Sequence, residues 1–256
     1  MNGNHQNVLG IIPARYNSSR LTGKPLLLIE NKPMIQHVFE KTKKILDHVV
    51  VATDDKRIFD CVNQFGGNVV MTKSEHQTGT DRCLEAFLIW TKNNDINPSV
   101  ILNIQGDEPM LCEEHLLKVI DCFEDSSTTM ASLALQLTKK DQLQPGMVYL
   151  TRDHSENALY FSRNPIPFLP EHEFKNWTQH HNYLQHIGLY GFTPKALERF
   201  CALKKSQLEI KENLEQLRWL ENGQKIRIAT TNQKTHPVDT LDDLTKVRAL
   251  FSSKGE

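Results

Sequence analysis

VLGIIPARYNSSRLTGKPL, residues 8–26, is the stretch that decides the fold of this 256-residue chain. It opens with a short run of branched apolar residues, 8–12, that ends at a proline, which is typical of a buried strand in a parallel sheet. The loop that follows carries three cations, Arg15, Arg20 and Lys24, and a glycine. Open α/β sheets bind ligands beyond the carboxyl ends of their strands, and glycine lets backbone amides approach a ligand closely. We therefore interpret the loop as a polyphosphate cradle, with a solvated basic loop as the alternative.

Composition limits what the protein can be. The net charge is -1 with 24% charged residues, so the basic loop is a local feature and sequence-independent nucleic-acid binding is not expected. The chain has no run of 18 apolar residues, and its first residues lack the layout of a signal peptide. We expect no membrane insertion and a cytoplasmic location. The five cysteines form no C-x-x-C pair, which favours free thiols over disulfides or a zinc site.

Strand-like and helix-like segments alternate in the first half, which predicts a mainly parallel sheet with helices on both faces. The expected helices are 32–45, 56–65 and 81–92, and the expected strands are 8–12, 48–53, 68–71 and 99–104. From about 130 to 194 the segments are shorter and are punctuated by Asn, Gly and Pro, which predicts antiparallel strands and hairpins. One helix over 208–223, a strand over 225–231 and a C-terminal helix complete the prediction. We expect a single domain spanning 1–256, with its antiparallel part at approximately 130–200.

Acidic residues follow two of the predicted elements. Asp107 and Glu108 lie just beyond the strand 99–104, and Asp239 lies just before the C-terminal helix. Magnesium is held by one or two carboxylates together with substrate phosphates and water. The basic loop is not a P-loop, because the G-x-x-x-x-G-K-[ST] pattern is absent. The basic loop and the acidic turns together predict a metal–nucleotide site, in which Glu108 is expected to cap a helix or form a salt bridge rather than bind metal.

Eight motifs carry a resemblance to a known family. They are IIPARYNSSRLTGKPL, VATDD, HQTGTDR, NIQGDEPM, YFSRNPIPF, HIGLYGF, LEQLRWLENGQKI and VDTLDDL. Their order and spacing resemble those of the 3-deoxy-manno-octulosonate (Kdo) cytidylyltransferases, over a span from about Val8 to about Leu250. The first motif alone indicates a sugar nucleotidyltransferase, and YFSR, HIGLYG and LEQLR together narrow the resemblance to the Kdo branch.

The resemblance implies an α/β nucleotide-diphospho-sugar transferase (Rossmann-like) fold, with an antiparallel extension that binds sugar and forms a homodimer. It implies Mg²⁺-dependent joining of CTP and Kdo to give CMP-Kdo and pyrophosphate for lipopolysaccharide biosynthesis. Two alternatives stay open at this point. One is activation of a related sugar acid, such as 8-amino-Kdo or another ulosonic acid. The other is a catalytically silent nucleotide-binding paralog, which would be expected to lack Lys24, Asp107 or Asp239, and all three are present.

The resemblance also implies roles for individual positions. Arg15, Lys24 and Asp107 are expected to act in catalysis, and Asp107 and Asp239 to bind metal. The nucleotide-binding residues are expected to be Ala14, Arg15, Ser18, Arg20, Lys24, Thr78, Gly79, Asp81 and Arg82. The sugar-binding residues are expected to be Gln105, Arg163, His186, Tyr190, Glu212 and Gln216. Arg163 suits an anionic sugar because guanidinium pairs bidentately with carboxylate.

Two further expectations concern the sugar motifs. On one helix over 208–223, Glu212 and Gln216 would lie about 40° apart, with Ile210, Leu214 and Leu217 on the opposite, core-facing side. The sequence also departs from the family pattern at Thr22, at 145–149, where it reads PGMVY, and at Pro237. None of these departures removes an expected phosphate or metal ligand, but the change at Gly146 and Tyr149 is expected to bear on sugar preference or rate.

Overall fold

The computed structural model of the chain describes residues 7–17, 20–144 and 146–253. By its internal contacts the chain forms two compact units, Met1–Leu116 with Thr235–Glu256, and Leu117–Lys234. None of the helices in the described ranges has the length and apolar character that crossing a bilayer requires. All five cysteines lie in these ranges, and no disulfide joins any two of them.

A parallel sheet forms the centre of the first unit. Strand β1 (Val8–Ala14) pairs in parallel with β4 (His48–Thr53) on one side and with β6 (Val100–Asn103) on the other, and β4 pairs in parallel with β5 (Val69–Met71). The side chains of β1 and β4 are almost entirely buried, which is why both strands read as continuous apolar runs rather than alternating ones. The predicted parallel sheet is confirmed.

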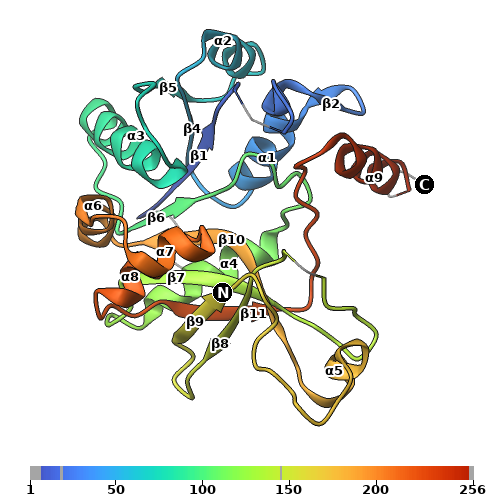
Figure 1. Cartoon of the computed structure of the whole chain (residues 1–256). Coiled ribbons are helices and arrows are strands. Elements are labelled where there is room, and N and C mark those ends of the chain that lie inside the picture. The colour runs from blue at the N-terminus through green and yellow to red at the C-terminus, as the bar shows by residue number, and fades with distance from the viewer. Residues whose placement is uncertain (1–6, 18–19, 145, 254–256) are drawn as a thin grey trace. The chain divides into compact units, whose positions relative to one another are not determined.

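Helices cover the two faces of this sheet. In Figure 1, α1 (Met34–Lys43) and α3 (Gly79–Asn94) lie on opposite sides of β1 and β4. Helix α2 (Lys56–Gln64) ends just before Gly66, which has a φ of +75° and so stops the helix as predicted. The chain returns to this unit in α9 (Leu241–Ser252), whose Leu244 and Val247 pack with Ile29, Met34 and Met110. The remaining elements are the 3₁₀ turn η2 (Lys24–Leu26), the short strands β2 (Leu28–Ile29) and β3 (Lys32–Pro33), and α4 (Glu113–Asp121), which runs on into the second unit.

The second unit is built on antiparallel strands. β10 (Leu184–Phe192) pairs antiparallel with β7 (Met130–Gln136) and with β8 (Tyr149–Arg152), and β8 pairs antiparallel with β9 (Ala158–Ser162). β11 (Arg227–Thr231) adds to β7 in parallel. Figure 1 shows β8 and β9 side by side as a hairpin. Around these strands lie η3 (Cys122–Glu124), η4 (Phe174–Asn176), α5 (Trp177–His180), α6 (Pro194–Ala202), α7 (Gln207–Glu212) and α8 (Leu217–Glu221).

The single helix predicted over 208–223 is wrong. Helix α7 ends at Glu212, Asn213 takes a left-handed conformation with φ 52°, and α8 begins only at Leu217. Asparagine tolerates this conformation better than most residues, so it acts here as a C-cap. The expected geometry of Glu212 and Gln216 on one helical face therefore does not hold. Leu214 and Leu217 are buried as predicted, but Ile210 is 58% exposed.

Candidate functional site

The basic loop after β1 is closed on itself. The backbone N–H of Gly23 donates to the carbonyl of Tyr16 at 2.8 Å, and Gly23 has a φ of +70°. A side chain at this position would be strained by that φ and would also meet the Tyr16 ring at 3.2 Å. The glycine thus places Lys24 at the start of η2, directly beyond the turn. Ser18, predicted to bind nucleotide, lies outside the described residues.

Lys24 joins the two predicted metal carboxylates. Its Nζ lies 2.5 Å from Oδ2 of Asp107 and 3.1 Å from Oδ1 of Asp239, and its side chain is only 12% exposed. Arg20 also reaches Asp239, with 2.9 Å between Nη2 and Oδ1. Burial lowers the pKa of Lys24, but the neighbouring charges of Asp107 and Asp239 outweigh this, so the net pKa is raised and the ammonium is retained. The structure therefore brings the basic loop and both acidic turns together.

A pocket of about 340 Å³ opens beside this cluster in the first unit. Its lining combines the end of β1, the basic loop, the start of α3 and the turn after β6: Pro13, Ala14, Arg15, Asn17, Lys24, Pro25, Gln77, Gly79, Gln105, Gly106 and Asp107. A Cβ at Gly106 would lie 3.1 Å from the Pro13 carbonyl oxygen, so glycine permits the close approach of the two strand ends. Gly79 is the first residue of α3, and helix N-termini favour anions.

Residues predicted for the nucleotide and for the sugar both line this pocket. Gln105, assigned to the sugar, shares it with the predicted nucleotide residues Ala14, Arg15, Lys24 and Gly79. Sequence reasoning did not single out Asn17, Gln77 or Gly106. Their positions could have indicated them, because each lies beside a motif residue at the end of a strand or at the start of a helix.

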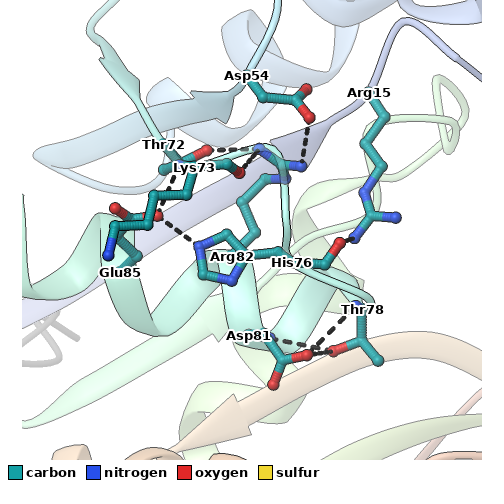
Figure 2. A network of polar contacts seen from close by, with 9 residues as sticks. All are labelled: Arg15, Asp54, Thr72, Lys73, His76, Thr78, Asp81, Arg82 and Glu85. Carbon is teal, nitrogen blue, oxygen red and sulfur yellow. Dashed lines mark hydrogen bonds and ion pairs between the residues drawn. The ribbon is translucent and has the colours of Figure 1, made fainter.

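Three of the other predicted nucleotide residues belong to α3 and its cap. Thr78 is the N-cap and forms a capping box with Asp81, since each side chain accepts from the other's backbone N–H. The Arg82 side chain is fully buried and donates to Asp54 at 3.0 Å and to Thr72 at 2.5 Å. Figure 2 shows two separate groups: the Arg82 guanidinium with Asp54 and Thr72, and Thr78 with Asp81. The contacts give all three a part in the fold, and their nucleotide-binding roles stay predictions.

Glu108 differs from its expected role. It is 7% exposed, and its Oε2 has no hydrogen-bond partner among the described residues. Burial, together with the charges of Asp107 and Asp239, raises its pKa to about 8. The sequence predicted a helix cap or a salt bridge. The described residues give it neither. Its raised pKa favours the protonated form, which adds no third negative charge beside Asp107 and Asp239.

The two carboxylates suit one kind of metal. Among the described residues no group of three or more His, Cys, Asp or Glu side chains could hold a metal ion. Asp107 and Asp239 nevertheless both approach one cationic atom, the Nζ of Lys24. A pair of oxygen donors, completed by phosphate oxygens and water, fits magnesium rather than zinc.

Two predicted sugar residues lie together on β10 in the second unit. The rings of His186 and Tyr190 are 5.3 Å apart, and Phe161 packs edge-on against His186. The hydroxyl of Ser132 donates to the carbonyl of Leu189 at 2.9 Å, so it accepts from Nε2–H of His186, also at 2.9 Å. Burial lowers the pKa of His186 to about 3, and the ring is neutral.

The other predicted sugar residues of this unit lie around the break between α7 and α8. The Glu212 carboxylate accepts from the Ser162 hydroxyl and from the backbone N–H of Arg163, each at 2.9 Å. The Arg163 guanidinium donates to the backbone carbonyls of Glu212, Asn213 and Gly146 at 2.7, 3.1 and 3.2 Å. The two side chains thus tie the end of β9 to the end of α7.

Gln216 and its neighbour Glu215 complete this part of the second unit. Gln216 is 2% exposed, and its Nε2 has no partner among the described residues. Burial raises the pKa of Tyr190 well above its usual value, and the charge of Glu215 adds to that rise. Sequence reasoning did not assign Glu215 a role, although it lies inside the LEQLR motif. Tyr149, one of the departures, is 1% exposed and bonds through its hydroxyl to the backbone of Gln144, which makes it a core residue.

The parallel sheet, the glycine-containing basic loop and the pocket lined by Arg15, Lys24 and Asp107 suit the class of the nucleotidyltransferases. A cytidylyltransferase family model matches residues 9–226. Curated relatives named 3-deoxy-manno-octulosonate cytidylyltransferase match 96% of the chain at 42–45% identity, so the chain belongs to that family. A relative of that name from Bacteroides thetaiotaomicron is 45% identical, and one from Parabacteroides distasonis is 42% identical. Each alignment covers 96% of this chain and 98% of the relative.

Solved structures support the same fold. The structure of CMP:2-keto-3-deoxy-manno-octonic acid synthetase complexed with CTP superposes with a TM-score of 0.87 at 36% identity, covering 97% of this chain and 100% of the other. The 4-diphosphocytidyl-2C-methyl-D-erythritol synthase of Anaerococcus prevotii, at 14% identity and a TM-score of 0.61, shares the fold alone. The predicted α/β fold class is confirmed.

Proposed function

We propose that this chain is the enzyme that joins CTP to Kdo, releasing pyrophosphate and forming CMP-Kdo. The observation that carries the proposal is the pocket at which Arg15, Lys24 and Asp107 meet. Support comes from the relatives, which are named for this reaction over nearly their whole length, and from the similar structure that is described with CTP bound. Those names do not favour the alternative of an amino-substituted or other ulosonic acid.

The reaction sets clear demands on the pocket. The anomeric hydroxyl oxygen of Kdo forms a bond to the α-phosphorus of CTP, the bond from that phosphorus to the bridging oxygen breaks, and the electron pair leaves with pyrophosphate. The hydroxyl proton must pass to a base or to water. Negative charge grows on the phosphate oxygens as this happens, and fixed cations aimed at those oxygens lower the barrier.

Arg15 and Lys24 are the cations of this chain that can meet that demand. Both line the pocket, and the closed loop fixes where they start. In our proposal Asp107 and Asp239 hold Mg²⁺, which supplies charge neutralisation at the phosphates when bound. Lys24 supplies a fixed ammonium beside the same carboxylates, and with Mg²⁺ in place that ammonium would be available to the triphosphate oxygens.

We also propose that the second unit provides the sugar contacts. His186, Tyr190 and Gln216 offer a neutral imidazole, a phenol and an amide, which suit the hydroxyls of Kdo. Arg163 offers a positive charge, although its guanidinium already donates hydrogen bonds to three backbone carbonyls. In this proposal its charge acts on the sugar carboxylate while its hydrogen bonds fix the strand end. A homodimer, a cytoplasmic location and a place in lipopolysaccharide biosynthesis belong to the same proposal.

Pyrophosphate release measured over a panel of nucleotides and sugar acids tests the proposal. We expect turnover with CTP and Kdo, and much less with ATP, GTP or UTP, or with other ulosonic acids. The variant Lys32→Ala removes an exposed lysine that pairs with Glu40 on the surface. It should turn over the same panel as the wild type does, which controls for a change of charge alone. Turnover preferring another sugar acid would overturn the substrate assignment. Nucleotide binding without release of pyrophosphate from any pair would indicate a catalytically silent paralog.

A further inference from the structure

The loop that precedes α3, residues 72–78, is fastened to the helix along its length. Arg82 donates to the Thr72 hydroxyl at 2.5 Å and to the Lys73 carbonyl at 3.3 Å, which holds the start of the loop. The capping box of Thr78 and Asp81 holds its end. Figure 2 shows the middle of the loop held by a third residue of α3, Glu85.

Glu85 holds the middle of the loop through one carboxylate oxygen. Its Oε2 accepts from the backbone N–H of Lys73 at 2.8 Å and also bonds to Nε2 of the His76 ring. Asp81 and Glu85 are four residues apart, so they project from the same side of the helix toward the loop. The His76 side chain is 19% exposed and that of Glu85 is 22% exposed, so water only partly screens their bond.

His76 is also the residue that touches the basic loop. Its backbone carbonyl accepts a hydrogen bond from Nη2 of Arg15, as Figure 2 shows. Arg15 lines the pocket, and so does Gln77, the next residue along the loop from His76. A guanidinium has five N–H donors, so one bond to a carbonyl leaves the others for an anion.

We infer that His76 and Glu85 are positioning residues: their bond holds the His76 carbonyl against Arg15, and so orients that guanidinium toward the triphosphate before the nucleotide arrives. Arginine otherwise loses much side-chain freedom on binding, and orienting it beforehand lowers that cost. The inference rests on the proposed function, since it takes Arg15 to be a ligand of CTP. Neither residue touches the substrate in this account.

The kinetic test uses the purified full chain with CTP, Kdo and Mg²⁺. We expect His76→Ala and Glu85→Ala each to raise KM for CTP roughly fivefold to thirtyfold, as the loss of one charge-assisted bond would, and to change kcat less than about twofold. His76→Gln should restore most of the affinity, because its amide can still donate to Glu85. The exposed His154 and Glu198, each changed to alanine, are matched controls and should leave KM unchanged.

The decisive arm changes Arg15 as well. If His76 acts through Arg15, His76→Ala should add almost nothing to KM in an Arg15→Ala background. Equal effects of His76→Ala in both backgrounds would show that it only supports the loop, and would overturn the inference.

A readout without substrate separates the inference from the proposed function. NMR order parameters of the Arg15 Nε–H, measured in nucleotide-free protein, should fall in His76→Ala and Glu85→Ala and recover in His76→Gln. A wild type that fails to bind CTP would overturn the proposed function. Unchanged Arg15 order in both alanine variants would overturn the inference even if the wild type turns CTP over.

Discussion

The Nζ of Lys24 lies 2.5 Å from Oδ2 of Asp107, although the two residues are 83 positions apart in the chain. One comes from the loop after β1 and the other from the turn after β6, and these two strands are neighbours in the parallel sheet. Adjacent parallel strands bring their carboxyl ends to the same edge of a sheet, so the ion pair follows from the topology. A site for a charged ligand is thereby assembled from two loops that the sequence keeps far apart.

The first prediction concerns Lys24 itself. Lys24→Ala should reduce pyrophosphate release by about a hundredfold or more, because it removes a fixed cation from developing negative charge. It should also lower the melting temperature slightly in metal-free buffer, since Asp107 and Asp239 then lose the ammonium between them. Steady-state kinetics and thermal unfolding measure the two effects.

Lys32→Ala is the control for that experiment. Its side chain is 47% exposed and pairs with Glu40 on the surface, where such pairs contribute little to stability. If Lys24→Ala released pyrophosphate as fast as Lys32→Ala does, Lys24 would have no part in the reaction.

The sequence predicted the first unit well because its signals are local. Buried strands are visible in the sequence as apolar runs. Gly66 ends a helix because glycine adopts a positive φ without strain. The convergence of Asp107 and Asp239 was also predicted, since both positions adjoin an edge of the expected sheet. That they share Lys24 could not be predicted, because it depends on side-chain directions across three loops.

Helix α6 escaped prediction although its sequence carries a clear signal. Helix α6 begins after Thr193, whose side chain accepts from the Ala196 N–H, and Pro194 occupies its first position. A threonine cap followed by proline is a usual helix start. Here the pair comes directly after a strand-like segment, so the sequence prediction includes both residues in that segment. The break at Asn213 is different, because it depends on how the side chains on its two sides pair with one another.

A buried ion pair fixes that break and gives the second prediction. Arg218 in α8 donates through Nε to Glu209 in α7 at 2.9 Å, and a second bond joins Nη2 to the other carboxylate oxygen. The two side chains are 4% and 7% exposed. Glu209→Ala removes the carboxylate that neutralises a buried guanidinium, so we expect it to lower the free energy of unfolding by about 3–5 kcal/mol, measured in denaturant.

Glu198→Ala, on the exposed side of α6, is the matched control and should change stability by less than about 0.5 kcal/mol. If Glu209→Ala were no more destabilising than this control, the ion pair would not be what holds α7 and α8 at their angle.

The third prediction follows from the buried imidazole of His186. Its pKa is lowered to about 3 by burial, against a usual value near 6.5. Below pH 6.5 the unfolded chain takes up a proton that the folded chain refuses, so the stability that this residue contributes is complete above that pH and is lost as the pH falls toward 3. We expect a loss of about 2 kcal/mol in the free energy of unfolding between pH 7 and pH 5, measured by denaturant unfolding at a series of pH values.

His186→Gln should flatten this part of the pH profile, because glutamine does not titrate and can still donate to Ser132. The rings that pack against His186, those of Phe161 and Tyr190, carry no negative charge that could form an ion pair with an imidazolium. His154→Gln, at an exposed histidine, should keep the wild-type profile. Identical slopes for the wild type and His186→Gln between pH 7 and 5 would contradict the assignment.

The last prediction concerns the proposed magnesium. Asp107→Asn and Asp239→Asn should each lose most activity, by about a hundredfold, because each removes one of two oxygen donors that carry charge. Excess chelator should silence the wild type until Mg²⁺ is restored. Without turnover, Mg²⁺ and CTP together should raise the melting temperature of the wild type more than CTP alone, and this difference should vanish in both variants.

Glu108→Gln separates metal binding from burial at the same turn. With its pKa near 8, Glu108 is mainly protonated at pH 7, so glutamine replaces a neutral group of the same shape and the loss of activity should be milder. Asp60→Asn, at a surface carboxylate 47% exposed and paired with Lys56, controls for charge alone. Full turnover in excess chelator, or a normal Mg²⁺ response of both Asp107→Asn and Asp239→Asn, would show that these carboxylates hold no catalytic metal and that their partners are the cations of the basic loop, Lys24 and Arg20.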